Sequence, residues 1–276
     1  MKTIQWFPGH MNKTRNKMKE FLSQTDLVVE VIDARIPRSS RNPVIRDIFH
    51  NKPFLILLNK TDLADPKVTD KWINYFHNQP DTKALAVSSI EPGGVKKIIP
   101  ACLALGRKRL NTISALIAGV PNSGKSSVIN AVNKSKKAGV QNKPGHTKDF
   151  QRIIVSRELH LIDTPGLLWT KFENQQTGIN LAIMGSIKDE ILDIPSLAAF
   201  AAEFLAKSYP EYLRERYTIE ELAAEASEII GQIGRKRGFL VKGGGVDYDR
   251  AAALLINELR GGKLGRISLE SPETDL

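Results

Sequence analysis

The stretch that most constrains the fold is GVPNSGKSS at 119–127. It matches the pattern G-x-x-x-x-G-K-[ST], and an apolar run before it and a helical pattern after it provide the strand–loop–helix context that the motif requires. Glycines let backbone N–H groups turn toward phosphate oxygens, and the helix N-terminus favours negative charge. The stretch therefore predicts a phosphate-binding loop, in which Lys125 contacts the β- and γ-phosphates and the Ser126 hydroxyl binds Mg²⁺.

Six apolar runs rich in β-branched residues predict the buried strands of a sheet. Four of them alternate with helical patterns and predict parallel strands joined by right-handed crossovers. The last two are so close together that they predict an antiparallel hairpin. The predicted strands are 27–33, 54–59, 84–89, 114–119, 152–156 and 159–164, and the helical patterns are 43–50, 66–78, 93–109 and 124–134. The expected fold class is α/β, with a doubly wound sheet.

The composition changes after about residue 172, where Ala, Leu and Glu recur with helical periodicity at 196–209, 218–234 and 249–262. Thr218 and Glu221 form a candidate capping box at the start of the second segment. The expected organisation is a nucleotide-binding domain at 1–172, which includes a basic segment at 1–24, and a small all-helical domain at 173–266. The acidic, polar tail at 267–276 is expected to be disordered.

A second phosphate-related element, Asp163-Thr164-Pro165-Gly166, closes a predicted strand downstream of the loop. In that place Asp163 is predicted to hold Mg²⁺, directly or through water, and the Gly166 N–H to sense the γ-phosphate. Thr147, in the loop NKPGHTKDF, is a candidate switch threonine that binds Mg²⁺ when the γ-phosphate is present. The predicted Mg²⁺ ligands are thus Ser126, Thr147 and Asp163.

The run FLILLNKTD at 54–62 ends a predicted strand in an N-K-x-D pattern. The Asp62 carboxylate can accept hydrogen bonds from both N1–H and the exocyclic amine of guanine, whereas adenine would leave it desolvated and unpaired. Asn59 is expected to bridge the base and the phosphate loop, the Lys60 stem to cover the ring, and a backbone N–H of the SSI stretch at 88–90 to reach guanine O6. The predicted GTP contacts are Asn59, Lys60, Asp62, Ser88, Ser89, Asn122, Ser123, Gly124, Lys125, Ser126, Ser127 and Gly166.

The order of these motifs is unusual, because N-K-x-D precedes the phosphate loop here and follows it in most GTPases. Moving segment 27–109 to follow segment 112–168 restores the usual series. Every motif then falls at the carboxyl end of its strand, where α/β sheets bind ligands. Domain termini often lie close together, so such a rearrangement can preserve a fold. The order predicts a circularly permuted GTPase.

Several stretches together resemble the circularly permuted GTPases and, within them, the family of ribosome biogenesis GTPase A. They are WFPGHM at 6–11, DARIPRSSRNP at 33–43, NKTD at 59–62, GVPNSGKSS at 119–127, DTPGLLW at 163–169 and KRGFLVKGGGVDYD at 236–249. The resemblance covers nearly the whole chain. It implies a GTPase that acts late in assembly of the large ribosomal subunit, with a helical C-terminal domain that contacts ribosomal RNA. The single cysteine, Cys102, excludes the zinc module usual in permuted relatives of the small-subunit branch.

The residue after Gly166 is Leu167, where many GTPases carry a glutamine that orients the attacking water. The resemblance implies that another group takes this role, and His10 and His146 are the candidates. Either histidine could instead have a surface or packing role, which we favour for His146. The predicted catalytic residues are His10, Lys125, Thr147 and Gly166, and a mobile His10 ordered by the ribosome predicts slow intrinsic turnover with strong activation.

Asn122 resembles the asparagine that binds K⁺ in potassium-stimulated GTPases, which would make K⁺ a second cofactor beside Mg²⁺. The alternative is an asparagine that simply favours the turn.

A formal charge of +10 and a pI near 9.6 are compatible both with a polyanionic partner, most often nucleic acid, and with a solvated basic face. The basic clusters at 13–19, 107–109, 134–148 and 235–242 favour the partner, because several fall in predicted loops or helix ends near the nucleotide-binding motifs. The sequence shows neither a membrane-spanning run nor a signal-peptide core, and a single cysteine fits a reducing cytoplasm. The expected partners are GTP or GDP and the large-subunit precursor with its rRNA, with no membrane or DNA. The candidate RNA contacts are Arg235, Lys236, Arg237, Lys242, Arg250 and Lys263.

Two rival functions remain. A GTP-regulated RNA-binding scaffold with negligible hydrolysis is consistent with Leu167 after the D-T-P-G motif. A protein-signalling switch without an RNA partner is disfavoured by the basic clusters.

Overall fold

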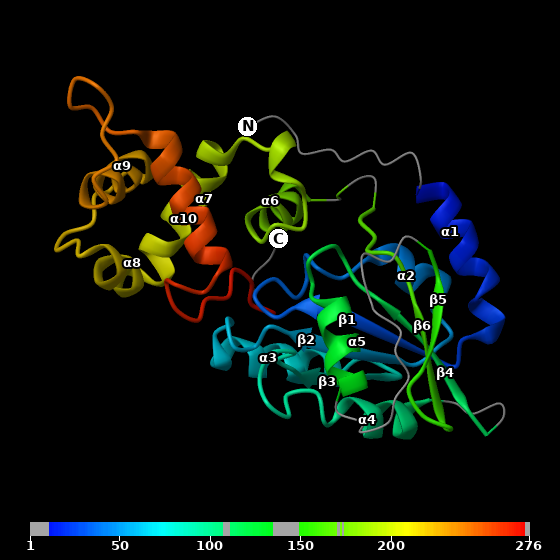
Figure 1. Cartoon of the computed structure of the whole chain (residues 1–276). Helices are drawn as coiled ribbons and strands as arrows, with labels where there is room; N and C mark the ends of the chain where they lie inside the picture. The colour runs from blue at the N-terminus through cyan, green and yellow to red at the C-terminus, as the bar shows by residue number, and fades with distance from the viewer. Residues whose placement is uncertain (1–10, 107–110, 135–148, 170–171, 173, 274–276) are drawn as a thin grey trace.

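The structure, a computed structural model, contains one mixed six-stranded sheet with strand order β3-β2-β1-β4-β6-β5 (Figure 1). It describes residues 11–106, 111–134, 149–169, 172 and 174–273. All neighbouring strands are parallel except β5 and β6, which pair antiparallel. The strands are β1 (Leu27–Asp33), β2 (Phe54–Asn59), β3 (Thr82–Ala86), β4 (Ile113–Ala118), β5 (Gln151–Ile154) and β6 (Leu159–Asp163). The prediction of an α/β sheet with one antiparallel hairpin is confirmed.

The centre of the sheet is the parallel pair β1–β4, in which Val29 lies opposite Ile117. β1 belongs to the segment that precedes the phosphate loop, and β4 leads directly into that loop. The two halves of the chain therefore form one continuous sheet, and the carboxyl ends of β1, β2, β4 and β6 meet at one edge. This is the arrangement expected for a permuted order of the motifs.

Helices cover both faces of the sheet because its strands are apolar on both sides. Leu27, Val29 and Val31 of β1 pack on α4 (Ile98–Leu105) and α5 (Lys125–Lys134). Val28 and Ile32 pack on the other face of the sheet, which three further helices cover. These are α1 (Met11–Glu20), α2 (Pro43–Ile48) and α3 (Pro66–His77). Asn42 and Asp65 cap α2 and α3 by accepting hydrogen bonds from backbone N–H groups of the first turn.

The C-terminal helices pack into a second core (Figure 1). They are α6 (Gln175–Ile183), α7 (Ile194–Ser208), α8 (Pro210–Tyr217), α9 (Ala226–Lys236) and α10 (Tyr248–Arg260). Two 3-10 turns occur among the described residues, η1 (Leu22–Gln24) and η2 (Asp189–Ile191). Ile36, Val120, Leu168 and Trp169 of the sheet-containing part are buried in this same core. The two parts therefore share packed side chains. None of the described helices is both long and apolar enough to cross a bilayer.

Three local expectations differ from the structure. Thr218 is the left-handed residue after α8, with φ +56°, and α9 begins only at Ala226, so the expected capping box is wrong. The helix expected from residue 93 begins at Ile98, because Gly93 has φ +79°. The helices α6 and α8 were not anticipated from the sequence.

The expected disorder of the tail is wrong for residues 267–273, while 274–276 lie outside the described residues. Ile267 N–H donates to the Leu63 carbonyl at 3.0 Å, and Leu269 N–H donates to the Arg35 carbonyl at 2.8 Å. Glu270 is buried. We call residues 266–273 the C-terminal strap, because they run across the loops after β1 and β2. Its polar composition is typical of a disordered tail, but polar groups such as the Glu270 carboxylate accept hydrogen bonds from other parts of the chain.

Candidate nucleotide site

The phosphate loop joins β4 to α5 and depends on Gly124. This glycine has φ +89°, and a Cβ there would lie 2.2 Å from the Asn59 side-chain nitrogen. Both the left-handed backbone and the close approach exclude other residues. Asn122 is also left-handed, with φ +61°, which asparagine tolerates better than most residues. The loop therefore has the turned backbone that lets N–H groups face an anion.

Asn59, at the end of β2, contacts the phosphate loop directly. Its Nδ2 donates to the Ser123 carbonyl at 2.9 Å, and both residues are buried. Asn59 Oδ1 and Ser123 Oγ are buried without a hydrogen-bond partner among the described residues. Buried polar atoms are normally paired, so these two mark a place where a ligand or water supplies hydrogen bonds. The segment that carries N-K-x-D and the phosphate loop thus form one surface.

A buried ion cluster supports Lys60, whose backbone is left-handed at φ +64°. Lys60 Nζ lies 2.9 Å from Asp33 Oδ2, and the Arg35 guanidinium contacts both Asp33 oxygens at 2.8 and 2.9 Å. Burial raises the pKa of Asp33, but the charges of Arg35 and Lys60 outweigh it and hold that pKa well below its usual range. In the sequence, Asp33 and Arg35 belong to the DARIPRSSRNP stretch, which by itself does not indicate this ion cluster. The pairing of β1 with β2, which places Asp33 opposite Asn59, gives Asp33 its role.

The carboxylate predicted to read guanine is held beside the loop after β3. Ser88 Oγ donates to Asp62 Oδ1 at 2.8 Å, and Thr61 N–H and Oγ1 both donate to the Val87 carbonyl at 3.2 and 2.9 Å. Ser89, the other predicted contact, is half-buried next to Ser88. The two segments predicted to contact guanine are therefore bonded to each other.

The residues predicted to bind the phosphates and Mg²⁺ also lie close together. Lys125 Nζ forms an ion pair with Asp163 Oδ1, and both side chains are buried. Ser126 is half-buried at the first turn of α5, and Ser127 is exposed. Gly166 is exposed, and a Cβ there would lie 3.4 Å from Pro121 of the phosphate loop. A hydroxyl and a carboxylate are the oxygen ligands that Mg²⁺ prefers, so Ser126 and Asp163 fit this ion. Thr147, His10 and His146 lie outside the described residues.

The segment after Gly166 leads from the phosphate loop into the helical core. Leu167 N–H donates to the Gly119 carbonyl at 3.2 Å, and its carbonyl accepts from Asn42 Nδ2 at 3.1 Å. Leu168 and Trp169 are buried among the C-terminal helices. A change at the phosphate loop therefore has a continuous packed route to those helices.

Asn122 contacts the helical part of the chain. Its Nδ2 donates to the Gly185 carbonyl at 2.5 Å, in the turn after α6. The side-chain oxygen is the atom that would bind K⁺ in the role predicted above.

The six candidate RNA contacts are all exposed, but they do not form one patch. Five lie at the end of α9, in the loop after it and in the first turn of α10: Arg235, Lys236, Arg237, Lys242 and Arg250. Arg250 lies over the Phe239 ring at 4.1 Å, and Arg237 over Tyr217 at 5.3 Å. Lys263 follows the far end of α10, a helix of 13 residues and thus roughly 20 Å long.

Comparison with known proteins agrees with this geometry. A family described as 50S ribosome-binding GTPase matches residues 114–226. Ribosome biogenesis GTPase A of Bacillus cereus is 44% identical over 98% of this chain and 94% of its own length. Two solved structures, described as GDP-bound YlqF and as GNP-bound YlqF from Thermotoga maritima, have TM-scores of 0.69 and 0.67 at 32% and 31% identity. They cover 94% and 95% of this chain and 100% of their own.

Proposed function

The chain belongs to the ribosome biogenesis GTPase A family, and from that premise we propose that it acts in late maturation of the large ribosomal subunit, with GTP hydrolysis stimulated by that subunit. Membership of this family shows that the chain is a GTPase involved in ribosome biogenesis. The observation that carries the finer proposal is the path from Gly166 through Leu168 and Trp169 into the core of the helical part. That path gives the nucleotide a means to act on a bound partner.

Ser126 and Asp163 would hold Mg²⁺, which neutralises charge on the β- and γ-phosphates. Lys125 would move from Asp163 to the phosphates, because both anions compete for the same ammonium group. The Gly166 N–H would donate to the γ-phosphate. GTP binding is therefore expected to break the Lys125–Asp163 ion pair and to reposition the segment that ends at Trp169.

The attacking water needs a group other than Leu167, and we propose His10 for that role, with Thr147 completing the Mg²⁺ site. Turnover of His10→Ala in the presence of large subunits tests the first role, and subunit-stimulated hydrolysis at the wild-type rate would remove it. We also propose that Asn122 binds K⁺ once its amide leaves Gly185. Equal turnover in KCl and NaCl would refute that assignment.

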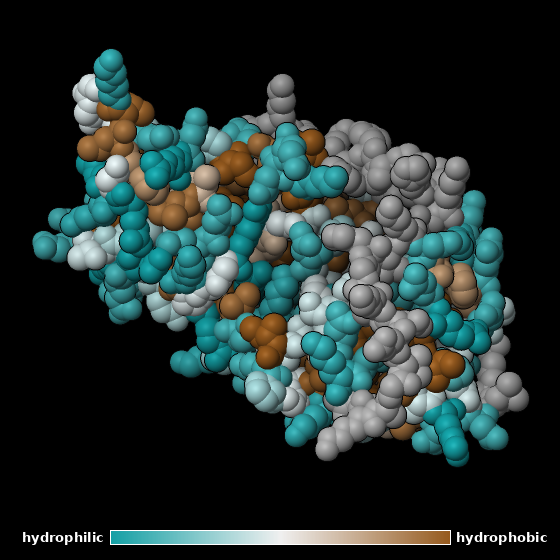
Figure 2. Space-filling view, viewed as in Figure 1, coloured by the Kyte–Doolittle hydropathy of each residue, from teal (hydrophilic) through white to brown (hydrophobic). Residues whose placement is uncertain are grey.

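We propose that the helical part contacts rRNA through the surface around the loop between α9 and α10. This loop projects from the molecule (Figure 1), and hydrophobic and hydrophilic side chains lie side by side around it (Figure 2). Leu240 and Val241 of the loop are exposed. Apolar and basic side chains together suit RNA, where phosphates need charge and unstacked bases need apolar contact. With such a partner, we propose that the protein acts in the cytoplasm.

The decisive experiment is GTP turnover with isolated large subunits, with isolated small subunits and with neither. Stimulation by large subunits alone supports the proposal. A second candidate, an RNA-binding scaffold with negligible hydrolysis, is favoured by Leu167, whose side chain offers water no hydrogen bond. Binding to large subunits without turnover under any of these conditions would select the scaffold.

A further inference from the structure

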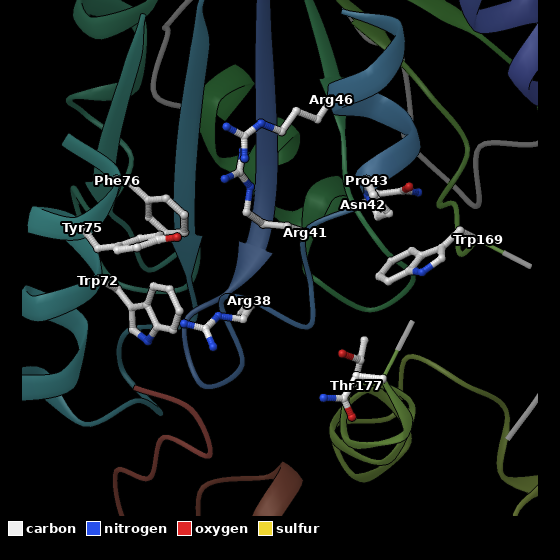
Figure 3. Close-up of a pocket in the computed structure, with 11 residues that line it drawn as sticks. Arg38, Arg41, Asn42, Pro43, Arg46, Trp72, Tyr75, Phe76, Trp169 and Thr177 are labelled. Carbon is white, nitrogen blue, oxygen red and sulfur yellow. The ribbon is translucent and has the colours of Figure 1, made fainter. Parts of the chain in front are cut away.

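A pocket of about 730 Å³ opens between α2, α3, α6 and the segment after Gly166, apart from every predicted nucleotide contact (Figure 3). Three arginines and four aromatic residues line it, and among the residues that the structure describes no acidic side chain lines it. They are Arg38, Arg41, Arg46, Trp72, Tyr75, Phe76 and Trp169, with Asn42, Pro43, Asn174 and Thr177 completing the wall. The lining is therefore basic and aromatic at once.

Two of the three guanidinium groups are fixed in place. Arg41 lies over the Phe76 ring at 5.1 Å and bonds to Glu30 at 3.1 Å and to Gln79 at 3.2 Å. Arg38 lies over the Trp72 ring at 5.4 Å and donates to the Pro272 carbonyl at 2.9 Å. Their positions are thus set before any ligand arrives, which lowers the entropy cost of binding.

The third guanidinium is available. Arg46 is exposed and forms no hydrogen bond or ion pair with any residue that the structure describes. In Figure 3 it extends toward the side of the pocket where Tyr75 and Phe76 lie. Tyr75 meets both Trp72 and Phe76 edge-on and is 41% exposed, so a face of its ring can take a partner. A free cation and a free aromatic face therefore border the same space.

These features suit a ligand that combines an anion with a flat ring. A single-stranded RNA segment has both, because its phosphates bind arginine and its unpaired bases stack on aromatic and guanidinium planes. Duplex RNA presents the phosphates but keeps its bases inside the helix. An acidic peptide presents carboxylates and lacks the ring at each unit.

The pocket also borders the segment that responds to the nucleotide. Asn42 of its wall donates to the Leu167 carbonyl at 3.1 Å, and Trp169 lines it two residues further on. We propose that this pocket binds a single-stranded RNA segment, with a phosphate on Arg46 and a base stacked on Tyr75. This rests on the proposed function, since it gives rRNA a contact on the sheet-containing part in addition to the helical one.

Fluorescence anisotropy of the full chain with a short labelled single-stranded RNA of mixed sequence tests the pocket. Tyr75→Ala removes the stacking ring and is expected to weaken binding roughly tenfold. Arg46→Ala removes one phosphate contact and is expected to weaken binding and to reduce the slope of log Kd against log salt by about 0.7. Tyr75→Phe keeps the ring and is expected to bind as the wild type does.

Matched controls remove similar groups elsewhere. Arg157→Ala deletes an exposed arginine in the turn between β5 and β6, and Phe200→Ala deletes a 39% exposed ring on α7. Both are expected to bind as the wild type does. Wild-type affinity in Arg46→Ala and Tyr75→Ala, or equal losses in the controls, would overturn the proposal, as would equally effective competition by duplex RNA or by a poly-glutamate peptide.

Crosslinking locates the contact directly. A single-stranded RNA that contains 4-thiouridine is expected to crosslink to the tryptic peptide 72–83, which carries Trp72, Tyr75 and Phe76. Crosslinks confined to the α9–α10 loop would contradict the pocket. Subunit-stimulated turnover of the wild type, measured separately, keeps the two proposals apart. If large subunits stimulate turnover but Arg46→Ala and Tyr75→Ala bind RNA as the wild type does, only the pocket proposal is refuted. If both variants bind RNA more weakly but large subunits do not stimulate turnover, only the proposed function is refuted.

Discussion

The side-chain amide of Asn59 donates a hydrogen bond to the Ser123 carbonyl at 2.9 Å, and this bond joins the end of β2 to the phosphate loop. The chain reaches Asn59 long before it reaches the loop, yet β1 alone separates β2 from β4 in the sheet. The segments predicted to read the base and to bind the phosphates are therefore in direct contact. The predictions below concern contacts of this kind between distant segments.

Asn59→Ala is expected to weaken both GTP and GDP binding roughly tenfold, because the loss of one buried hydrogen bond of about 1 kcal/mol also frees the phosphate loop. Isothermal titration calorimetry with each nucleotide measures the loss. Asn74→Ala, which removes an exposed amide on α3, is the matched control. Unchanged affinity in Asn59→Ala would show that the loop holds its shape without this bond.

Asp62→Ala is expected to abolish discrimination between GDP and IDP, because IDP lacks the exocyclic amine that would donate a hydrogen bond to the carboxylate. The wild type is expected to prefer GDP by at least about tenfold, since a site that hydrogen-bonds a substrate group rejects its analogue strongly. Competition binding with both nucleotides measures the ratio. Ser88→Ala removes only the 2.8 Å hydrogen bond to Asp62 and is expected to keep most of the preference. A ratio retained in Asp62→Ala would assign guanine recognition to another group.

Asp33→Asn is expected to destabilise the protein by about 3 kcal/mol or more, because Arg35 is 2% exposed and would lose its counter-charge. It should also loosen α10, since Arg35 Nη1 donates to the Arg260 carbonyl at 2.9 Å. Chemical denaturation measures the change. Asp70→Asn, at an exposed position on α3, is the control.

The difference in unfolding free energy between the wild type and Asp33→Asn is also expected to depend on pH. The pKa of Asp33 is lowered in the folded protein, so its contribution to stability is present above the unfolded value of 3.8 and is lost as the pH falls below it. Wild-type unfolding free energy should therefore decline in this acidic range more steeply than that of Asp33→Asn. Parallel curves would show that the Asp33 cluster does not couple to folding.

Glu270→Ala is expected to release the C-terminal strap. Its carboxylate accepts hydrogen bonds from Arg38 N–H at 2.7 Å and from Asn180 Nδ2 at 2.8 Å, and the loss of this buried acceptor costs about 2 kcal/mol. Hydrogen exchange of residues 266–273 reports the release. Glu273→Ala, which removes an exposed ion pair with Lys71, is expected to have little effect.

Glu270 responds to pH in the opposite sense from Asp33. Burial raises the pKa of Glu270, so its contribution to stability is present below the unfolded value of 4.5 and is lost as the pH rises through the folded value. The difference in unfolding free energy between the wild type and Glu270→Ala should therefore shrink as the pH rises. A difference that grows with pH would show that the ionised carboxylate is the stabilising form.

The sequence alone predicted the strands because local signals agree with the fold. In β1 every residue is buried, and the apolar run at 27–33 matches the strand residue for residue. The helices α6 and α8 were not predicted from the sequence because neither shows a clear amphipathic pattern. Most of α6 is buried all round, and its residues Ile179 to Ile183 read from the sequence as well as a strand as they do as a helix.

The sequence by itself determined which chemical groups stand at the strand ends, because strand period, turn glycines and motif spacing are local properties. Tertiary structure decided which of those groups meet. The contact of Asn59 with the phosphate loop was expected from the N-K-x-D motif, whereas the Asp33–Arg35–Lys60 cluster, the buried Glu270 and the pocket around Arg46 join residues from separate segments without such a motif. Such contacts depend on strand order and on how the helices cover the sheet, and no local pattern encodes them.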